Sequence, residues 1–331
     1  MKFNSYVLIF LFTFSAFSSF AQVVLPYGTG QGKVAFVNGN NYPGIEEPIP
    51  LGPKTFRLAG NDIWVADSIG GKLMQFSKEK GLIAEFSLLA SPATVLTSVS
   101  KVATKAPDLE LIIEDMAPVY DSEGKLVSWW IIDLMQNRLL NYSTDGKKIA
   151  ELKHEKFVQP FRVEVGTAGH IFVADKGSQA IFVFDSALKL LSQPNWEWSG
   201  FAVGSETDTL YRLFYEAESA KTYLVSQNLE NVIEKELELD LPEHLNPELW
   251  WVNEVDEEFV LTYTPATGFE GKFIIARIGF DGKVKTSQDL VPPIAMNRFI
   301  DHNNFAEIWL GAADYGTAPA GNLTLLPMVL P

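Results

Sequence analysis

Cysteine is absent from the 331-residue sequence, and histidine occurs only four times, as His154, His170, His244 and His302. The lack of cysteine excludes disulfides, a thiolate nucleophile and thiolate metal ligands. No two histidines have the i, i+4 or short-loop spacing of a metal site. The chain must therefore be stabilised by burial of a core, and we expect neither a metal site nor a cofactor.

A phosphate-binding motif and an excess of basic residues are also missing. The glycine-rich segment Gly28–Lys33 lacks the spacing between outer glycines, and the Ser or Thr after the lysine, that a phosphate-binding loop requires. Lysine and arginine number 26 against 41 aspartates and glutamates, which gives a net charge of −15. A surface of this sign repels nucleic acid and anionic lipid. We expect a monomer with no nucleic-acid partner.

A strongly apolar run lies at the N-terminus. Lys2 precedes the apolar core Tyr6–Phe14, and small residues follow it up to Ala21. This order predicts a secretory signal peptide, residues 1–21. A membrane anchor is the alternative, but the apolar core is too short to cross ~30 Å of hydrocarbon as a helix. We expect residues 22–331 to form an exported protein, periplasmic or extracellular, without a membrane span.

A unit of four short apolar runs recurs along the rest of the chain. Each run is rich in β-branched and aromatic residues and is bounded by Gly, Asn, Asp or Ser, which is typical of antiparallel strands joined by tight turns. The two clearest copies place the runs at residues 55–58, 63–67, 72–76 and 82–86, and at residues 162–165, 171–175, 180–185 and 188–191. Weaker copies cover residues 112–152, 198–239 and 250–290. One unit corresponds to one blade of a propeller.

The last unit has only three strands, at residues 297–301, 307–311 and 322–330. Its fourth strand must come from the other end of the chain, and we expect Val34–Val37 to pair beside Asn322–Leu330. Such closure protects sheet edges that would otherwise aggregate. The sequence therefore predicts an all-β, six-bladed β-propeller with four antiparallel strands per blade, whose last blade is closed by the N-terminal strand.

Three features of the clearest units carry a resemblance to a known family. They are a Gly-Pro-x-x-Phe pattern at 52–56, the run Ile-Trp-Val-Ala-Asp at 63–67, and apolar strands that end in Phe-Ser or Phe-Asp. These features resemble the NHL-repeat-like six-bladed propellers of secreted bacterial proteins. The likeness covers the first and third blades well and the others loosely. It implies the fold and leaves the function open, because the family includes ligand-binding modules, protein-interaction scaffolds, lyases and lactonase-like enzymes.

The same resemblance bears on two kinds of enzyme. Amidating lyases of this fold hold zinc with three histidines in the turns after second strands, where this chain has Gly70-Gly71, Gln136-Asn137 and Ser178-Gln179. Lactonase-like relatives hold a divalent cation with one Glu, two Asn and one Asp. Glu46 or Glu47 could supply the first ligand, but no asparagine occupies a matching place in the middle blades. The resemblance thus argues against both metal sites.

Three arginines are candidate ligand-binding residues. Arg57, Arg162 and Arg298 lie in the predicted innermost strands of blades one, three and six. Inner strands line the axis, and guanidinium groups that converge there would bind a carboxylate or phosphate through paired hydrogen bonds. Arg57 aligns better with Glu164 than with Arg162, which leaves open that the two arginines face different ways.

Two tryptophans and one insertion are further candidates for a binding surface. Trp196 and Trp198 lie in a loop beside Pro194, where exposed rings could stack on a sugar or contact a partner. The insertion of about residues 89–111 departs from the repeat and is either a specificity element on one face of the ring or a plain loop.

Asp67, Asp133 and Asp175 each follow the second strand of a blade. A carboxylate at that point can accept hydrogen bonds from the amides of the next turn. A residue that recurs once per blade is expected to be structural, so we assign these aspartates to turn formation.

No nucleophile, base and orienting residue stand out together, so we expect a binding scaffold for a small molecule, glycan or protein at one face of the ring. The alternative is a metal-assisted hydrolase of the lactonase-like class, with its site at the mouth of the axial channel.

Overall fold

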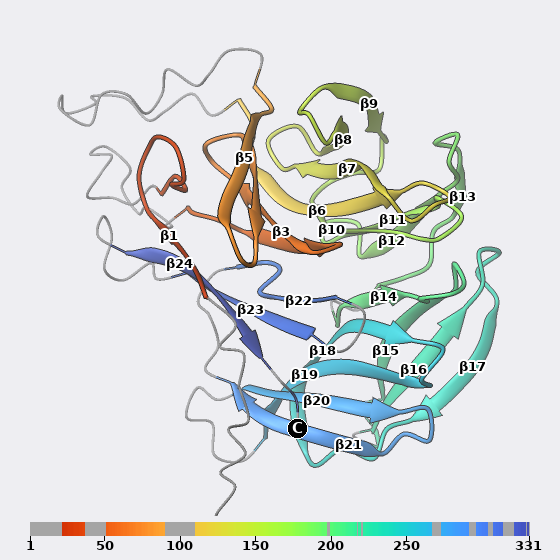
Figure 1. Cartoon of the computed structure of the whole chain (residues 1–331). Coiled ribbons are helices and arrows are strands. Elements are labelled where there is room, and N and C mark those ends of the chain that lie inside the picture. Colours follow the sequence, from red (N-terminus) through yellow and green to blue (C-terminus); the bar gives the residue numbers. More distant parts are fainter. Residues whose placement is uncertain are drawn as a thin grey trace, which may run out of the picture.

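The computed structural model describes residues 22–36, 51–89, 110–196, 199–216, 218–219, 221–266, 273–290, 296–303, 307–313, 321–328 and 330. The strands of these residues form six sheets of four antiparallel strands around a central axis (Figure 1). No helix in this part of the chain is long and apolar enough to cross a membrane. The all-β, six-bladed propeller is therefore confirmed.

Five blades are built from four consecutive strands each, the first of which is innermost. They are β2 (Thr55–Ala59), β3 (Asp62–Asp67), β4 (Lys72–Ser77) and β5 (Gly81–Ser87); β6 (Ile113–Tyr120), β7 (Leu126–Asp133), β8 (Arg138–Ser143) and β9 (Lys148–Lys153); β10 (Pro160–Val165), β11 (Ile171–Asp175), β12 (Ala180–Phe184) and β13 (Leu190–Ser192); β14 (Phe201–Val203), β15 (Leu210–Glu216), β16 (Lys221–Gln227) and β17 (Ile233–Glu238); and β18 (His244–Asn253), β19 (Glu258–Pro265), β20 (Phe273–Gly279) and β21 (Val284–Leu290).

The sixth blade joins the two ends of the chain. It consists of β22 (Ile300–Asn303), β23 (Glu307–Ala313), β24 (Asn322–Met328) and the N-terminal strand β1 (Val23–Pro26), in that order. Strand β1 pairs antiparallel with β24, with Val23 opposite Leu325. Closure of the last blade by an N-terminal strand is therefore as expected.

The closing segment itself differs from the one predicted. Val34 makes only an isolated bridge to Tyr27, and Val37 lies outside the described residues. Strand β1 is the outermost strand of its sheet, and one of its faces is exposed, since only Leu25 among its four residues is buried. Val34, Ala35 and Phe36 are all buried, and the amide of Ala35 donates to Asp67 of blade one. They fill the junction of the ring instead of extending a sheet.

The core lies between neighbouring blades. Trp64 of β3 contacts Trp129 of β7 at 5.2 Å between ring centroids, and Trp309 of β23 is fully buried. These rings, which come from second strands of their blades, fill the wedge between neighbouring sheets. Trp250 and Trp251 differ, because they lie on β18, the innermost strand of blade five.

The recurrent aspartates are turn formers, as predicted. Asp67 accepts from the Gly70 amide at 2.9 Å and Asp175 from the Ser178 amide at 2.8 Å, and Asp133 likewise accepts from a turn amide. Asp175 also accepts from the amide of Val158 at 2.9 Å, in the segment that precedes β10. These carboxylates therefore fix both the turns and a connection between blades.

Candidate functional site

Arg57 lies on the inner strand β2, Arg162 on the inner strand β10, and Arg298 just before the inner strand β22. All three belong to a set of charged side chains along the axis. We call this set the axial ion network; its members are Arg57, Asp115, Arg162, Glu164, Glu248, Arg298 and Asp301. Five of the six blades contribute to it. The network occupies the place where the sequence predicts a site for an anionic ligand, but carboxyl groups of the protein itself already pair with the arginines there.

Asp115 is the fully buried centre of the network. Arg298 donates to it from Nε at 2.9 Å and from Nη2 at 2.8 Å, in a bidentate pair. The hydroxyl of Thr55 and the amide of Val163 also donate to Asp115, at 2.8 Å and 3.0 Å. Burial would raise the pKa of Asp115, but Arg298 and the neighbouring guanidiniums lower it below its ordinary value. Asp115 is therefore held as a carboxylate.

Arg57 and Glu164 form a second bidentate pair, at 3.2 Å and 3.0 Å. Arg298 contacts the same Glu164 at 2.7 Å, and Asp301 lies 3.4 Å from Nε of Arg57. Asp301 also accepts from the amide of Leu58 at 2.6 Å. Arg57 and Glu164, which occupy equivalent positions in the first and third repeats, therefore contact each other directly.

The two carboxyl groups around Arg57 have opposite pKa shifts. Burial would raise the pKa of Glu164, but Arg298 and Arg57 together lower it. At Asp301, burial raises the pKa, and the lowering by Arg57 and Arg298 does not offset it. The pKa values of the two carboxyl groups are therefore shifted in opposite directions from their ordinary values.

Arg162 faces another way. Its Nη2 donates to Glu248 at 2.7 Å and to the carbonyl of Asn297 at 3.3 Å, and its guanidinium lies 4.5 Å from the ring centre of Trp250. Burial lowers the pKa of Arg162. The structure thus brings Arg57 and Arg298 together on Glu164 and gives Arg162 a different acid.

A cavity of about 770 Å³ opens beside this network at one end of the axis. Its floor includes Arg57, Glu164, Arg298 and Asp301. Every blade contributes to its walls, through residues at or after the end of the innermost strand that include Gly60, Tyr120, Thr167, Ser205, Trp251 and His302. The cavity is therefore a property of the whole ring. We call it the axial cavity.

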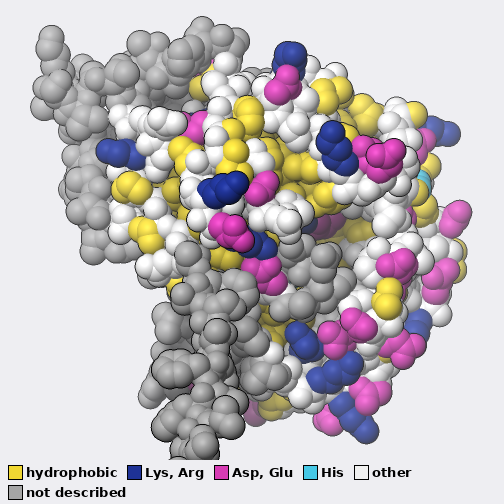
Figure 2. All heavy atoms as spheres, viewed as in Figure 1, with side chains coloured by type: hydrophobic (Ala, Val, Ile, Leu, Met, Phe, Trp, Pro, Cys, Tyr) yellow, Lys and Arg dark blue, Asp and Glu magenta, His cyan; other side chains and the backbone are white. Residues whose placement is uncertain are grey.

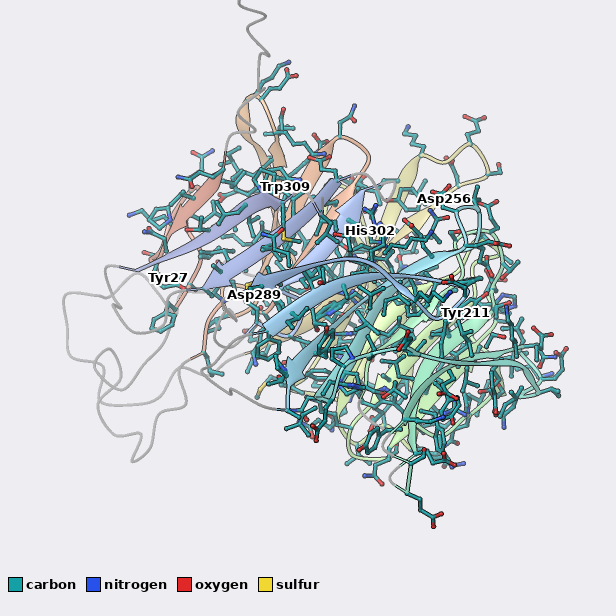
Figure 3. The ribbon with its side chains drawn as sticks, turned by 90° about the horizontal axis from the view of Figure 1, so that it is seen from below. Tyr27, Tyr211, Asp256, Asp289, His302 and Trp309 are labelled. Atoms are coloured by element: carbon teal, nitrogen blue, oxygen red, sulfur yellow. The ribbon has the colours of Figure 1, made fainter. Side chains whose placement is uncertain are left out.

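Aromatic side chains line part of the axial cavity. His302, labelled on blade six in Figure 3, stacks on Trp251 with 4.4 Å between ring centroids. Burial, with Arg57 nearby, lowers the pKa of His302 to about 3, so its imidazole is neutral at ordinary pH. Tyr120 is 44% exposed at the end of β6. The wall therefore offers one open ring and one neutral imidazole.

The rim is braced between blades three, four and five. Asp208 accepts from the hydroxyl of Thr167 at 3.0 Å and also contacts His170. Glu254 accepts from the amide of Thr207 and the hydroxyl of Tyr211, both at 2.9 Å. Each of these acids comes from one blade and binds the preceding one. The arrangement fixes half of the rim before any ligand arrives.

Exposure of Trp196 is a prediction that the structure corrects. Its side chain is 3% exposed and packs on Phe161 at 6.2 Å between ring centroids. The loop folds onto blade three, because the amide of Trp196 donates to the carbonyl of Gln179 at 2.9 Å. Trp198, Glu46, Glu47 and most of the insertion lie outside the described residues.

Sequence reasoning missed Asp115, Asp301, Glu248 and the neutral His302. The available signal was a charged residue inside an apolar inner strand, as at Asp115 between Ile113 and Met116. In the part of the chain that the structure covers, no group of three or more His, Asp or Glu side chains is arranged to hold a metal ion.

No family model matches the chain, and no curated protein matches it. Among solved structures, it is similar to a streptogramin B lyase (16% identity, 81% of this chain and 76% of that one, TM-score 0.45). It is also similar to an inactive virginiamycin B lyase from Staphylococcus aureus with quinupristin (14%, 84% and 80%, 0.47). A third is a gluconolactonase from Xanthomonas campestris (13%, 85% and 86%, 0.48). With scores this low, the fold assignment rests on the strand pairing of this chain, and these likenesses carry no function.

Proposed function

We propose that the protein is an exported binding scaffold without catalysis, which holds a small molecule in the axial cavity. The observation that carries the proposal is the cavity itself, whose volume of about 770 Å³ lies in the range of small-molecule sites. All six blades line it, and the braced rim lowers the ordering cost of binding.

The state of the charged groups supports binding over chemistry. Both carboxylate oxygens of Glu164 accept from Arg57, and Asp301 accepts from the amide of Leu58. His302 is stacked on Trp251. A general base must reach a substrate proton at hydrogen-bond distance. Groups that are already held by each other are better suited to orient a ligand than to attack it.

Native mass spectrometry tests this proposal. The purified protein is incubated with the fraction below 1 kDa of an extract from its native cells, then desalted and weighed. We expect a defined mass increment on the wild type and its loss in Ser122→Trp, which places a bulky ring at the cavity wall in the turn after β6. Ser219→Trp, at an exposed position outside the cavity, is the control and should keep the increment. The proposal is wrong if no increment forms, or if Ser122→Trp retains it while folded.

A metal-assisted hydrolase is the alternative, and one observation favours it. The pKa values of Glu164 and Asp301 are pushed apart at the cavity floor, a pattern that active-site acid–base pairs share. Hydrolysis of lactones and nitrophenyl esters, with calcium or magnesium and then with chelator, distinguishes the two. We expect no turnover above the blank. Metal-dependent turnover that is lost in Asp301→Asn would replace the scaffold proposal.

A further inference from the structure

The floor of the axial cavity presents compensated charge. Arg57 and Arg298 bring two guanidinium groups, and both contact Glu164, while Asp301 lies beside Arg57. An anionic ligand would meet the two carboxyl groups, and a cationic ligand would meet the two guanidiniums. A charged ligand of either sign would have to displace Arg57 or Glu164 from the bidentate ion pair that they already form. It would also lose the hydration of its own charge. The floor therefore disfavours ligands of net charge.

A neutral ligand with adjacent hydroxyl groups avoids both costs. A hydroxyl both donates and accepts, so neighbouring hydroxyls can accept from Arg57 and donate to a carboxylate oxygen without separating the pair. Its loss of hydration is small compared with that of an ion. The partly buried floor, where Arg57 is 9% exposed, thus matches the hydrogen-bonding capacity of a polyol.

The walls of the axial cavity also present uncharged groups that can bind a polyol. Ser122, Thr167 and Ser205 bring hydroxyls from three different blades, and each hydroxyl oxygen can accept a further hydrogen bond beside those it already makes. The neutral imidazole of His302 adds no charge. Tyr120 presents an open aromatic ring on which the C–H face of a sugar ring can pack.

We infer that the ligand of the axial cavity is a neutral, hydroxyl-rich molecule of the saccharide class. The inference rests on the proposed function and narrows it to one ligand chemistry. Arg57 and Glu164 bind adjacent hydroxyls at the floor, and Tyr120 contacts the apolar face of a ring at the wall.

The test is a matched panel of ligands that differ in charge. Neutral disaccharides (cellobiose, maltose, lactose) are compared with an anion of similar size (lactobionate) and a cation (the glucosamine dimer). Binding is followed by calorimetry and by tryptophan emission, because Trp250 and Trp251 line the cavity. We expect at least one neutral disaccharide to bind at least tenfold more tightly than either charged ligand. Absence of binding by all three neutral sugars, or tighter binding of a charged one, overturns the inference.

Two tyrosines of nearly equal exposure supply the matched variants. Tyr120→Ala removes the ring at the cavity wall and should weaken sugar binding roughly tenfold. Tyr215→Ala removes a ring that is 43% exposed on blade four, outside the cavity, and should leave affinity unchanged. Equal effects of the two variants would contradict the assignment of the wall.

A third variant tests the floor. Glu164→Gln keeps the shape of the side chain but removes the bidentate carboxylate partner of Arg57, which leaves only Asp301 as its charged neighbour. We expect the preference to shift toward lactobionate by at least tenfold relative to the neutral sugar. An unchanged preference in the folded variant counts against the role of the floor. If the saccharide inference fails while native mass spectrometry still finds a cavity ligand of another class, the proposed binding function stands.

Discussion

Asp115 shows how one side chain can connect several blades. It lies on β6 and accepts hydrogen bonds from Thr55 of β2, Val163 of β10 and Arg298, which precedes β22. A buried ion pair adds little net stability compared with apolar packing, but its disruption leaves an uncompensated charge. Four blades therefore depend on a single carboxylate.

We predict that Asp115→Asn destabilises the protein by about 3–5 kcal/mol, because Arg298 loses its bidentate carboxylate inside the ring and keeps only Glu164 as a charged partner. Chemical denaturation monitored by tryptophan fluorescence measures the loss. The control is Asp121→Asn, at an exposed turn where Oδ1 accepts from the amides of Glu123 and Lys125. That variant keeps an acceptor oxygen and should change stability by less than about 0.5 kcal/mol. Equal midpoints for both variants would refute the central role of Asp115.

At this scale the sequence predicts some of the site. The alignment of repeats gave Arg57 and Glu164 equivalent positions in their units, which left open that Arg57 and Arg162 face different ways, as they do. It did not predict that Arg57 and Glu164 contact each other. It did not find Asp115 as the partner of Arg298, because that contact joins blades two and six. Which inner strands face each other across an axis depends on closure of the ring, and no local pattern encodes it.

Among the elements, the short strand β1 closes the ring, because it joins the N-terminal end of the chain to the last blade. Its four residues complete the sheet of β22, β23 and β24. Leu25 is 2% exposed and belongs to the largest core cluster, whereas Val24 beside it is 44% exposed. The strand therefore has one face on the core and one in solvent.

We predict that Leu25→Ala lowers the free energy of unfolding by about 2–5 kcal/mol, since it removes buried apolar contacts at the closure. Val24→Ala, on the same strand, should cost less than about 0.5 kcal/mol. Hydrogen exchange should report faster exchange in β24 for the first variant only. Similar exchange in both variants would mean that β1 does not hold the ring closed.

At the scale of elements, the sequence predicted five of the blades well and the closing strand poorly. Blades one to five were predictable because each is a run of neighbouring strands with turns between them. The closing strand was misassigned because Val23–Pro26 and Val34–Val37 are both short, apolar runs. Only the difference in exposure separates an edge strand from a buried connection, and exposure depends on what packs against it.

Charge is unevenly distributed over the whole molecule. Residues 205–258, in blades four and five, contain fifteen acidic and three basic residues, a net charge of −12 within the total of −15. On the face of the molecule seen in Figure 2, acidic side chains gather where β16 and β17 of blade four lie. The outermost strand β17 carries Glu234, Glu236 and Glu238, all exposed. Like charges along an outer strand oppose pairing between copies, which protects the sheet edge.

Export is the remaining prediction at this scale. Expression of the full chain in a host with a secretion pathway should yield a protein whose N-terminus is Gln22, measured by N-terminal sequencing and intact mass. Replacement of Ala21 by Asp should block processing and leave the longer chain, because cleavage needs a small residue at this site. A wild-type protein that keeps residues 1–21 would refute the signal peptide.

The position of β1 also sets the order of events during synthesis. Val23 and Leu325 pair across about 300 residues, and closing a loop of that length costs on the order of 5 kcal/mol of chain entropy, against about 1 kcal/mol for a hairpin. Blades one to five can form as each is made, but the ring cannot close until β24 has left the ribosome. Closure is thus the last step, and an unfinished chain is an open arc in which blade one and blade six are not yet joined.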